Sequence, residues 1–233
     1  MQPTFSQIKA AYTSKNYTFF PESTPYNVNI WGIRKRFGKV DLFDDVLGLS
    51  CGDENGNIIH LVHAATVDPG LYYLKEKFEN PKGTFILKPG QYKGCWQKGS
   101  HKGKYIALVQ KPGYNKFQGW RDNRLDGEIQ RQLDKNGNFY QDVAGLNMHR
   151  SSETLSNIIG RYSAGCQVRK VNAEHKQVMG IIDKSLERFG NSFSYTLFDE
   201  EEVFSNADIR ERSLTRSIED IWPDSFMNVQ EKE

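Results

Sequence analysis

Apolar residues occur at two different spacings along this chain, and the spacing changes at a few well-marked points. Near the N-terminus, three of them fall on one face of a helix: Phe5, Ile8 and Tyr12. Pro21 and Pro25 then interrupt this pattern, because proline cannot donate the hydrogen bond that a helix interior requires. We therefore predict that residues 1–27 form a helical extension before the main domain.

Between about residue 28 and residue 148, short apolar runs alternate with turn-forming residues. The runs include Val28–Ile33, Ile58–Ala65, Gly83–Leu87 and Tyr105–Gln110, and the turns include Asp53–Asn57, Asp68–Gly70, Lys88–Gly90 and Lys111–Gly113. Short strands separated by Gly, Pro, Asn and Asp are typical of a β-barrel or a β-sandwich. The predicted fold class is therefore mainly β, of one of these two types, with a few helices, including ones appended at the two ends.

Helical spacing returns after residue 171. Asn172 is a candidate N-cap for a helix over about 173–189, whose apolar stripe consists of Val178, Met179, Ile182, Leu186 and Phe189. The run Phe193–Phe198 is predicted to be the closing strand of the domain. The main domain therefore spans 28–198.

The remaining segment, 199–233, is rich in charge and begins with an acidic run. It contains a second stripe at helical spacing, which ends before Pro223: Leu214, Ile218, Ile221 and Trp222. This stripe is expected either to pack on its own domain or to bind a partner, including a second copy of the chain, through residues 206–222.

The composition limits the classes of partner. The chain has 233 residues, and 31 basic residues nearly balance 29 acidic ones, so its charge does not call for a nucleic acid or a membrane surface. The densest basic cluster is expected to be a solvated hairpin rim: Lys98, His101, Lys102 and Lys104. No apolar run approaches the roughly 20 residues of a membrane-spanning helix, and the N-terminus lacks the pattern of a signal peptide. Synthesis as a soluble cytoplasmic protein is expected.

Neither the cysteines nor most of the histidines form a metal-binding pattern. Cys51, Cys95 and Cys166 are too scattered for a disulfide framework or a zinc site, although a bridge between the first two stays open. Four histidines lack metal-ligand spacing and are expected to be core or surface residues: His60, His63, His101 and His175. We expect neither a metal nor an organic cofactor.

The strongest chemical signal lies between residues 148 and 169. His149 precedes Cys166, which ends the run Ser163-Ala164-Gly165-Cys166. A thiol is mostly protonated at neutral pH, so a nucleophilic cysteine needs a neighbouring imidazole to take its proton. The small residues before the cysteine admit substrate and leave backbone N–H groups to bind an oxyanion. The alternative is that Cys166 is a structural thiol and His149 an ordinary strand histidine.

The segments Asn147–Ser151 and Gly160–Val168 resemble the active site of the L,D-transpeptidase catalytic domain, the YkuD-like fold. That family has a histidine, a spacer and then Ser/Thr-His-Gly-Cys. The resemblance implies that Cys166 is the nucleophile and His149 its base. It also implies that Ser163, Ala164 and Gly165 shape the turn, with the backbone around Gly165 and Cys166 binding the oxyanion.

Weaker resemblance extends over 28–198, to blocks of a divergent branch of this family found in bacteriophages and gut bacteria: Asn29–Arg34, Thr66–Gly70, Lys82–Thr84, Pro89–Tyr92 and Trp120–Asp122. It implies that the substrates are peptidoglycan stem peptides. The acyl group of an L-centred diamino acid next to D-Ala would pass to an amine or to water. Without an export signal, a phage lytic or virion-associated protein acting on the cell-wall side is expected. The alternative is a non-catalytic virion protein that keeps the fold and assembles through its tail.

The chain departs from the family pattern in three places. The spacer between the histidine and the run that ends in cysteine is at or just below the short end of the family's usual range. Ala164 stands in place of the second histidine, and Val168 stands where an arginine is frequent, with Arg169 one position later. The residues expected to bind substrate are Arg150, Arg161, Arg169 and Asp122, the last of them in a polar loop that ends at Glu128. The group that orients His149 is expected to be either Ser151 or a nearby backbone carbonyl.

Overall fold

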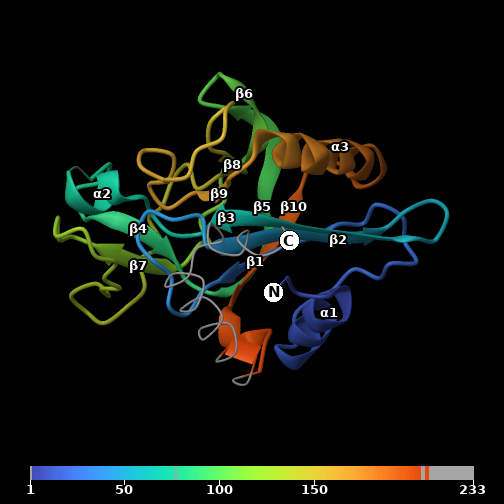
Figure 1. Ribbon diagram of the computed structural model, residues 1–233, viewed down its shortest axis with the longest axis horizontal. Helices are drawn as coiled ribbons and strands as arrows, with labels where there is room; N and C mark the ends of the chain where they lie inside the picture. The colour runs from blue at the N-terminus through green and yellow to red at the C-terminus, as the bar shows by residue number, and fades with distance from the viewer. Residues whose placement is uncertain (1, 77, 206–207, 210–233) are drawn as a thin grey trace, which may run out of the picture.

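The computed structural model describes residues 2–76, 78–205 and 208–209 (Figure 1). The stripe from Leu214 to Trp222, to which we assigned partner binding, lies outside the described residues. The helices are α1 (Phe5–Ser14), α2 (Leu71–Lys75), α3 (Asn172–Phe189) and the short 3₁₀ helix η1 (Glu200–Glu202). The strands are β1 (Asn29–Arg34), β2 (Asp45–Gly52), β3 (Ile58–Thr66), β4 (Thr84–Leu87), β5 (Gly90–His101), β6 (Tyr105–Gln110), β7 (Gly119–Asp122), β8 (Met148–Arg150), β9 (Gln167–Arg169) and β10 (Phe193–Asp199).

The prediction of a mainly β fold with a few helices is confirmed, and the larger sheet closes into a barrel. Its strand order is β1-β10-β5-β6-β8-β9-β3-β2, and β4 pairs with β7 in a separate two-stranded sheet. Two pairs in the barrel, β1 with β10 and β8 with β9, are parallel. The small sheet and α2 lie together at one end of the molecule, and α1 and α3 lie on opposite sides of the barrel (Figure 1). Within the described residues, no helix is long and apolar enough to cross a membrane.

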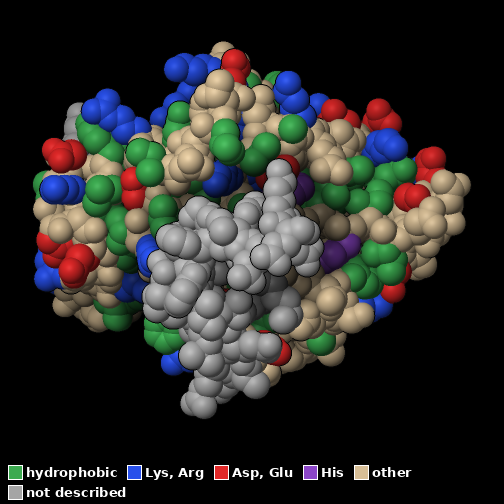
Figure 2. Space-filling view, viewed as in Figure 1, with side chains coloured by type: hydrophobic (Ala, Val, Ile, Leu, Met, Phe, Trp, Pro, Cys, Tyr) green, Lys and Arg blue, Asp and Glu red, His purple; other side chains and the backbone are tan. Residues whose placement is uncertain are grey.

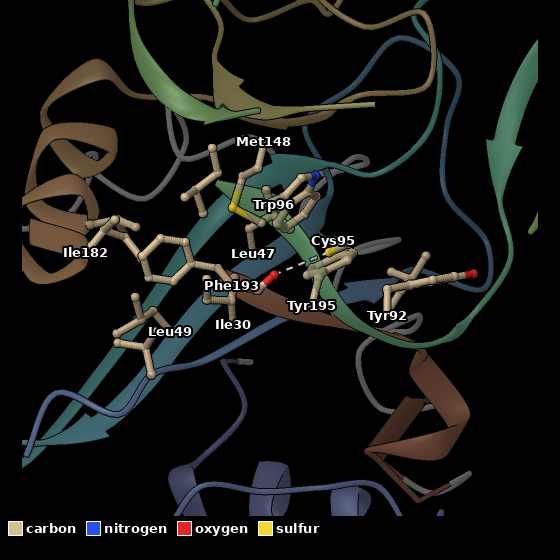
Figure 3. Packing of buried hydrophobic residues seen from close by; sticks show 14 of the residues in the cluster. Ile30, Leu47, Leu49, Tyr92, Cys95, Trp96, Met148, Ile182, Phe193 and Tyr195 are labelled. Carbon is tan, nitrogen blue, oxygen red and sulfur yellow. Dashed lines mark hydrogen bonds between the residues drawn. The ribbon is translucent and has the colours of Figure 1, made fainter. Parts of the chain in front are cut away.

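The barrel interior forms the main core. Leu47, Leu49 and Trp96 are almost completely buried there, and Ile182 of α3 lies beside Phe193 of β10 (Figure 3). Helix α3 begins one residue earlier than predicted. Val171 is its N-cap and makes no side-chain cap bond, so Asn172 is the first helical residue rather than the cap.

Helix α1 covers the outside of the barrel. The Thr4 side chain and the Gln7 side chain form a reciprocal capping box that satisfies donors at its N-terminus. Its buried face packs in a second cluster with Trp31 and Phe198, and the rings of Tyr12 and Phe198 meet edge to face at 5.3 Å. The N-terminal extension is therefore bound to the barrel by apolar contacts.

Charged side chains of both signs are interspersed around the edge of the face shown in Figure 2. This arrangement agrees with the formal net charge of only +2.

Leu47→Ala should strongly destabilise the protein, because Leu47 is fully buried in the barrel. Removing such a side chain leaves a cavity and costs about 2–5 kcal/mol. Ile58→Ala is the matched control, since Ile58 on the neighbouring strand is 50% exposed and its loss should cost well under half as much. Urea unfolding curves of both variants check this expectation, and equal losses would contradict the assignment of the core.

Candidate active site

The parallel pairing of β8 with β9 brings the two candidate catalytic residues together. His149 lies opposite Val168, and the Gln167 N–H donates to the carbonyl of Asn147 over 2.9 Å. Successive side chains alternate between the faces of a strand, so Cys166 lies on the same face as Val168 and His149. Consistent with this, Cys166 and Val168 belong to one apolar cluster outside the barrel core. Regular sheet spacing puts the Cα atoms of His149 and Cys166 about 8 Å apart.

A tight turn holds Cys166. The Ser163 hydroxyl donates to the Cys166 carbonyl over 2.8 Å and accepts from the Gly165 N–H over 3.2 Å. Gly165 has φ +115°, and a Cβ there would lie 2.4 Å from the Phe85 carbonyl oxygen, so only glycine fits. We expected the Gly165 N–H to bind an oxyanion. This N–H is instead used inside the turn and is not available to a substrate. The Cys166 N–H has no partner among the described residues.

A hydrogen-bond chain from the barrel core supports this turn. The Gln167 amide donates to the Gly165 carbonyl over 3.2 Å, and its oxygen accepts from the Tyr195 hydroxyl over 2.7 Å. Both side chains are fully buried. Gly32 leaves room for the hydroxyl, since a Cβ there would lie 2.1 Å from it. The interior of the barrel therefore fixes the backbone just before the cysteine.

The imidazole of His149 is oriented by a backbone carbonyl. Its Nδ1 lies 2.7 Å from the Arg150 carbonyl oxygen and 3.1 Å from the Tyr105 hydroxyl, which itself donates to the same carbonyl. A carbonyl can only accept, so Nδ1 carries the proton and Nε2 can take one from a thiol. The hydroxyl of Ser151 donates instead to the Lys170 carbonyl over 2.8 Å. Of the two orienting groups that we considered, the geometry favours the carbonyl.

Burial keeps both candidate catalytic groups neutral. Desolvation, followed by the influence of His101, lowers the pKa of His149 to about 3, and desolvation raises the pKa of Cys166 to about 11. The thiol donates to the Gly145 carbonyl over 3.5 Å, and within the described residues no hydrogen bond joins it to His149. The thiol therefore has to leave the Gly145 carbonyl before it can pass its proton to Nε2.

The other two cysteines are free thiols inside the core, so the bridge left open between Cys51 and Cys95 is absent. Cys166 is half-buried and is therefore the most accessible of the three.

A cavity of about 350 Å³ lies beside His149. One wall is the hairpin between β5 and β6, which contributes His101, Lys102, Lys104 and Tyr105. The charge of Lys102 lowers the pKa of both His149 and Cys166, although burial has the larger effect on each. We expected the whole basic cluster to be a solvated rim. Three of its members, His101, Lys102 and Lys104, line the cavity instead. Lys98 is the exception, because it pairs with Asp183.

Two of the predicted substrate-binding residues line this cavity. The guanidinium of Arg150 lies 4.2 Å from the centre of the Tyr105 ring and pairs with Glu153 over 2.9 Å. That of Arg161 lies 4.1 Å from the centre of the Tyr72 ring. Both cations are held by stacking next to the proposed base.

The other two predicted substrate-binding residues lie elsewhere. Arg169 is fully buried and faces inward, with Nε 3.4 Å from Nδ1 of His63, and desolvation lowers its pKa to about 10. Asp122 is fully buried as well and accepts from the N–H groups of Arg124 and Gln130, over 3.0 and 2.7 Å. It therefore stabilises its own loop.

No group of three His, Cys, Asp or Glu side chains with the arrangement of a metal site occurs among the described residues. No family model matches this chain, and neither does any curated protein or solved structure.

Gly165→Ala should destabilise the turn and change the reactivity of Cys166, because the new Cβ would collide with the Phe85 carbonyl. Gly113→Ala is the control, since Gly113 also has a positive φ, +77°, but a Cβ there meets nothing within 4 Å. Urea unfolding and the rate of alkylation of Cys166 measure the two effects. If both variants behave alike, the contact with Phe85 does not shape the turn.

Acid should destabilise the protein between pH 7 and pH 5. Burial lowers the pKa of four histidines below the ordinary value: His63, His101 and His175 to about 4 and His149 to about 3. The unfolded chain takes up these protons near pH 6.5, so the stability present above that pH is lost as the pH falls. Asp45 opposes this trend, since its pKa is raised to about 8 and it binds its proton in the folded state. Burial also raises the pKa of Glu174 and Asp199, and the four histidines outweigh these three carboxyl groups.

We expect a loss of more than about 1.4 kcal/mol, the equivalent of one pKa unit. Urea unfolding at the two pH values checks it, and an unchanged or higher stability at pH 5 would show that these histidines are not buried as described.

Proposed function

We propose that this protein is a cysteine acyl-transfer enzyme that acts on the stem peptides of peptidoglycan. Cys166 is the nucleophile and His149 the general base. The observation that carries this proposal is the pairing of β8 with β9, which puts both side chains on one face while the Arg150 carbonyl fixes the imidazole tautomer. The sequence resemblance to L,D-transpeptidases supports the substrate class.

In the first half of the reaction, the thiol proton passes to Nε2 of His149 as sulfur bonds to the acyl carbon. The Cys166 N–H donates to the resulting oxyanion. The C–N bond then breaks, and His149 returns the proton to the leaving amine, which leaves a thioester on Cys166.

In the second half, an amine or water attacks the thioester and gives its proton to His149. The thiol then regains this proton as the C–S bond breaks. With an amine, the product is a cross-link, and with water, it is a shortened stem peptide. His149 acts alternately as base and acid throughout, and no cofactor is needed.

The charge of the cavity supports a substrate that carries carboxylates. Lys102, Lys104 and Arg161 surround it, and Arg150 already has a partner in Glu153. A stem peptide that ends in D-Ala presents such a carboxylate next to the bond that is attacked. We place this reaction on the cell-wall side, in a phage lytic or virion-associated protein.

A second candidate function is that of a non-catalytic virion component that keeps the fold. The observation in its favour is the contact of the thiol with the Gly145 carbonyl in place of His149. In that role the cavity would bind peptidoglycan peptides without cleaving them, or would have no ligand.

Cys166→Ala should abolish the reaction with stem peptides. His149→Gln should reduce its rate by at least about 100-fold, because general base catalysis contributes about 10²–10⁴-fold. Mass spectrometry of the products distinguishes loss of D-Ala from new cross-links. Unchanged peptides with the unmodified protein would favour the virion component.

Alkylation by iodoacetamide provides the control for this experiment. Cys166 should react faster than the buried Cys51 and Cys95 through accessibility alone. The informative result is therefore a lower rate at Cys166 in His149→Gln, because only an activated thiol depends on the imidazole.

A further inference from the structure

His101 is a second imidazole in direct contact with the proposed base. It ends β5 and comes from a part of the sequence far from the His149–Cys166 segment. Its ring stacks on that of His149, with centroids 4.1 Å apart and an angle of 24° between the planes. Both rings line the cavity of about 350 Å³. The sequence had suggested only a core or surface role for His101.

The hydrogen-bond network fixes the tautomer of His101. The Gln110 N–H donates to the side-chain oxygen of Asn147 over 2.9 Å, so the amide nitrogen of Asn147 is the atom that lies 3.1 Å from Nδ1 of His101. That nitrogen donates, and Nδ1 therefore accepts. Burial, with smaller effects from Lys102 and Lys104, lowers the pKa of His101 to about 4. The ring is neutral at pH 7, and its proton is on Nε2.

Within the described residues no hydrogen bond joins this Nε2–H to another group, and although His101 as a whole is only 6% exposed, Nε2 is not one of the buried polar atoms that lack a partner, so solvent reaches it. Its other nitrogen is satisfied, and its outer edge borders the cavity. Because Nδ1 is engaged by Asn147, the direction of this donor is fixed, and a ligand oxygen in the cavity can replace water as its acceptor. The Gly165 N–H, which we had expected to serve the substrate, is used inside its own turn.

We propose that His101 is a second functional imidazole of this site and that its Nε2–H donates a hydrogen bond to a carbonyl or carboxylate oxygen of the bound acyl substrate. This assignment rests on the proposed function for the identity of the substrate. The role of His101 is that of a neutral donor, whereas His149 exchanges the proton. Lys102 and Lys104, on the same hairpin, add positive charge around the bound oxygen.

Two variants separate donation from stacking. His101→Gln supplies an amide N–H toward the cavity and an oxygen toward Asn147, but loses the ring. His101→Phe keeps a ring against His149 and loses the donor. We expect His101→Phe to lower kcat/KM for stem peptides by about 10- to 100-fold, the value of a hydrogen bond to a charged group, mainly through KM. We expect His101→Gln to stay within a few-fold of the unmodified protein.

Alkylation of Cys166 tests the same donor without peptide turnover. The reagents are iodoacetate, iodoacetamide and 2-bromoethylamine, the last of which has no oxygen and serves as the reference for thiol reactivity. Relative to this reference, His101→Phe should lower the rate of alkylation by iodoacetate alone if the bound oxygen belongs to a carboxylate. It should lower the rates of alkylation by iodoacetate and by iodoacetamide equally if the bound oxygen is a carbonyl oxygen. Lys98→Met is the control, because Lys98 pairs with Asp183 away from the cavity.

The proposal is overturned if the rates of peptide turnover and of alkylation are as high in His101→Phe as in His101→Gln, or higher. The ring of His101 would then act by stacking on His149. Thermal unfolding of both variants confirms that they fold. If the unmodified protein turns over no peptide but the alkylation ratios change as expected, the proposed function fails and the donor role of His101 stands. If turnover is found and the ratios do not change, only the assignment of His101 fails.

Discussion

Backbone pairing between two three-residue strands, β8 and β9, determines where the two candidate catalytic residues lie. The pairing is parallel, so the chain has to leave β8, cross a long loop and return in the same direction to start β9. His149, in the middle of β8, and Cys166, immediately before β9, are thereby brought into the same region of the barrel wall. Both strands belong to a closed barrel, whose other strands restrict their movement.

Polar side chains inside the barrel also support the turn before Cys166, and their burial lowers the stability of the core. Tyr195 and Gln167 satisfy each other, and Gln167 reaches the carbonyl of Gly165. Arg169 is less well satisfied, since both terminal nitrogens of its guanidinium are buried without a hydrogen bond among the described residues. Such groups weaken a core in comparison with apolar side chains of the same shape. Their presence next to the turn before Cys166 indicates that the arrangement of this turn, rather than stability alone, governs the local sequence.

Local patterns allowed much of the fold and part of the site to be predicted. The helix that became α3 and the strand that became β10 follow from the spacing of apolar residues, and the turn before Cys166 follows from its small residues. The contact of His101 with His149 could not be predicted, because His101 is at the end of the β5–β6 hairpin and only the pairing of β6 with β8 brings this hairpin to His149 from a distant part of the chain. The inward direction of the Arg169 side chain could not be predicted either, because a shift of one residue in a strand reverses the face to which a side chain points.

The burial that keeps Cys166 protonated also affects its durability. Peroxides and disulfides react with the thiolate form, and oxidation beyond the sulfenic acid is in general irreversible. With a pKa raised to about 11, only a small fraction of Cys166 is thiolate at neutral pH. The free protein should therefore keep its sulfur reduced in oxidising surroundings. The sulfur that we propose as the nucleophile is thus kept in the protonated form, which oxidants attack slowly.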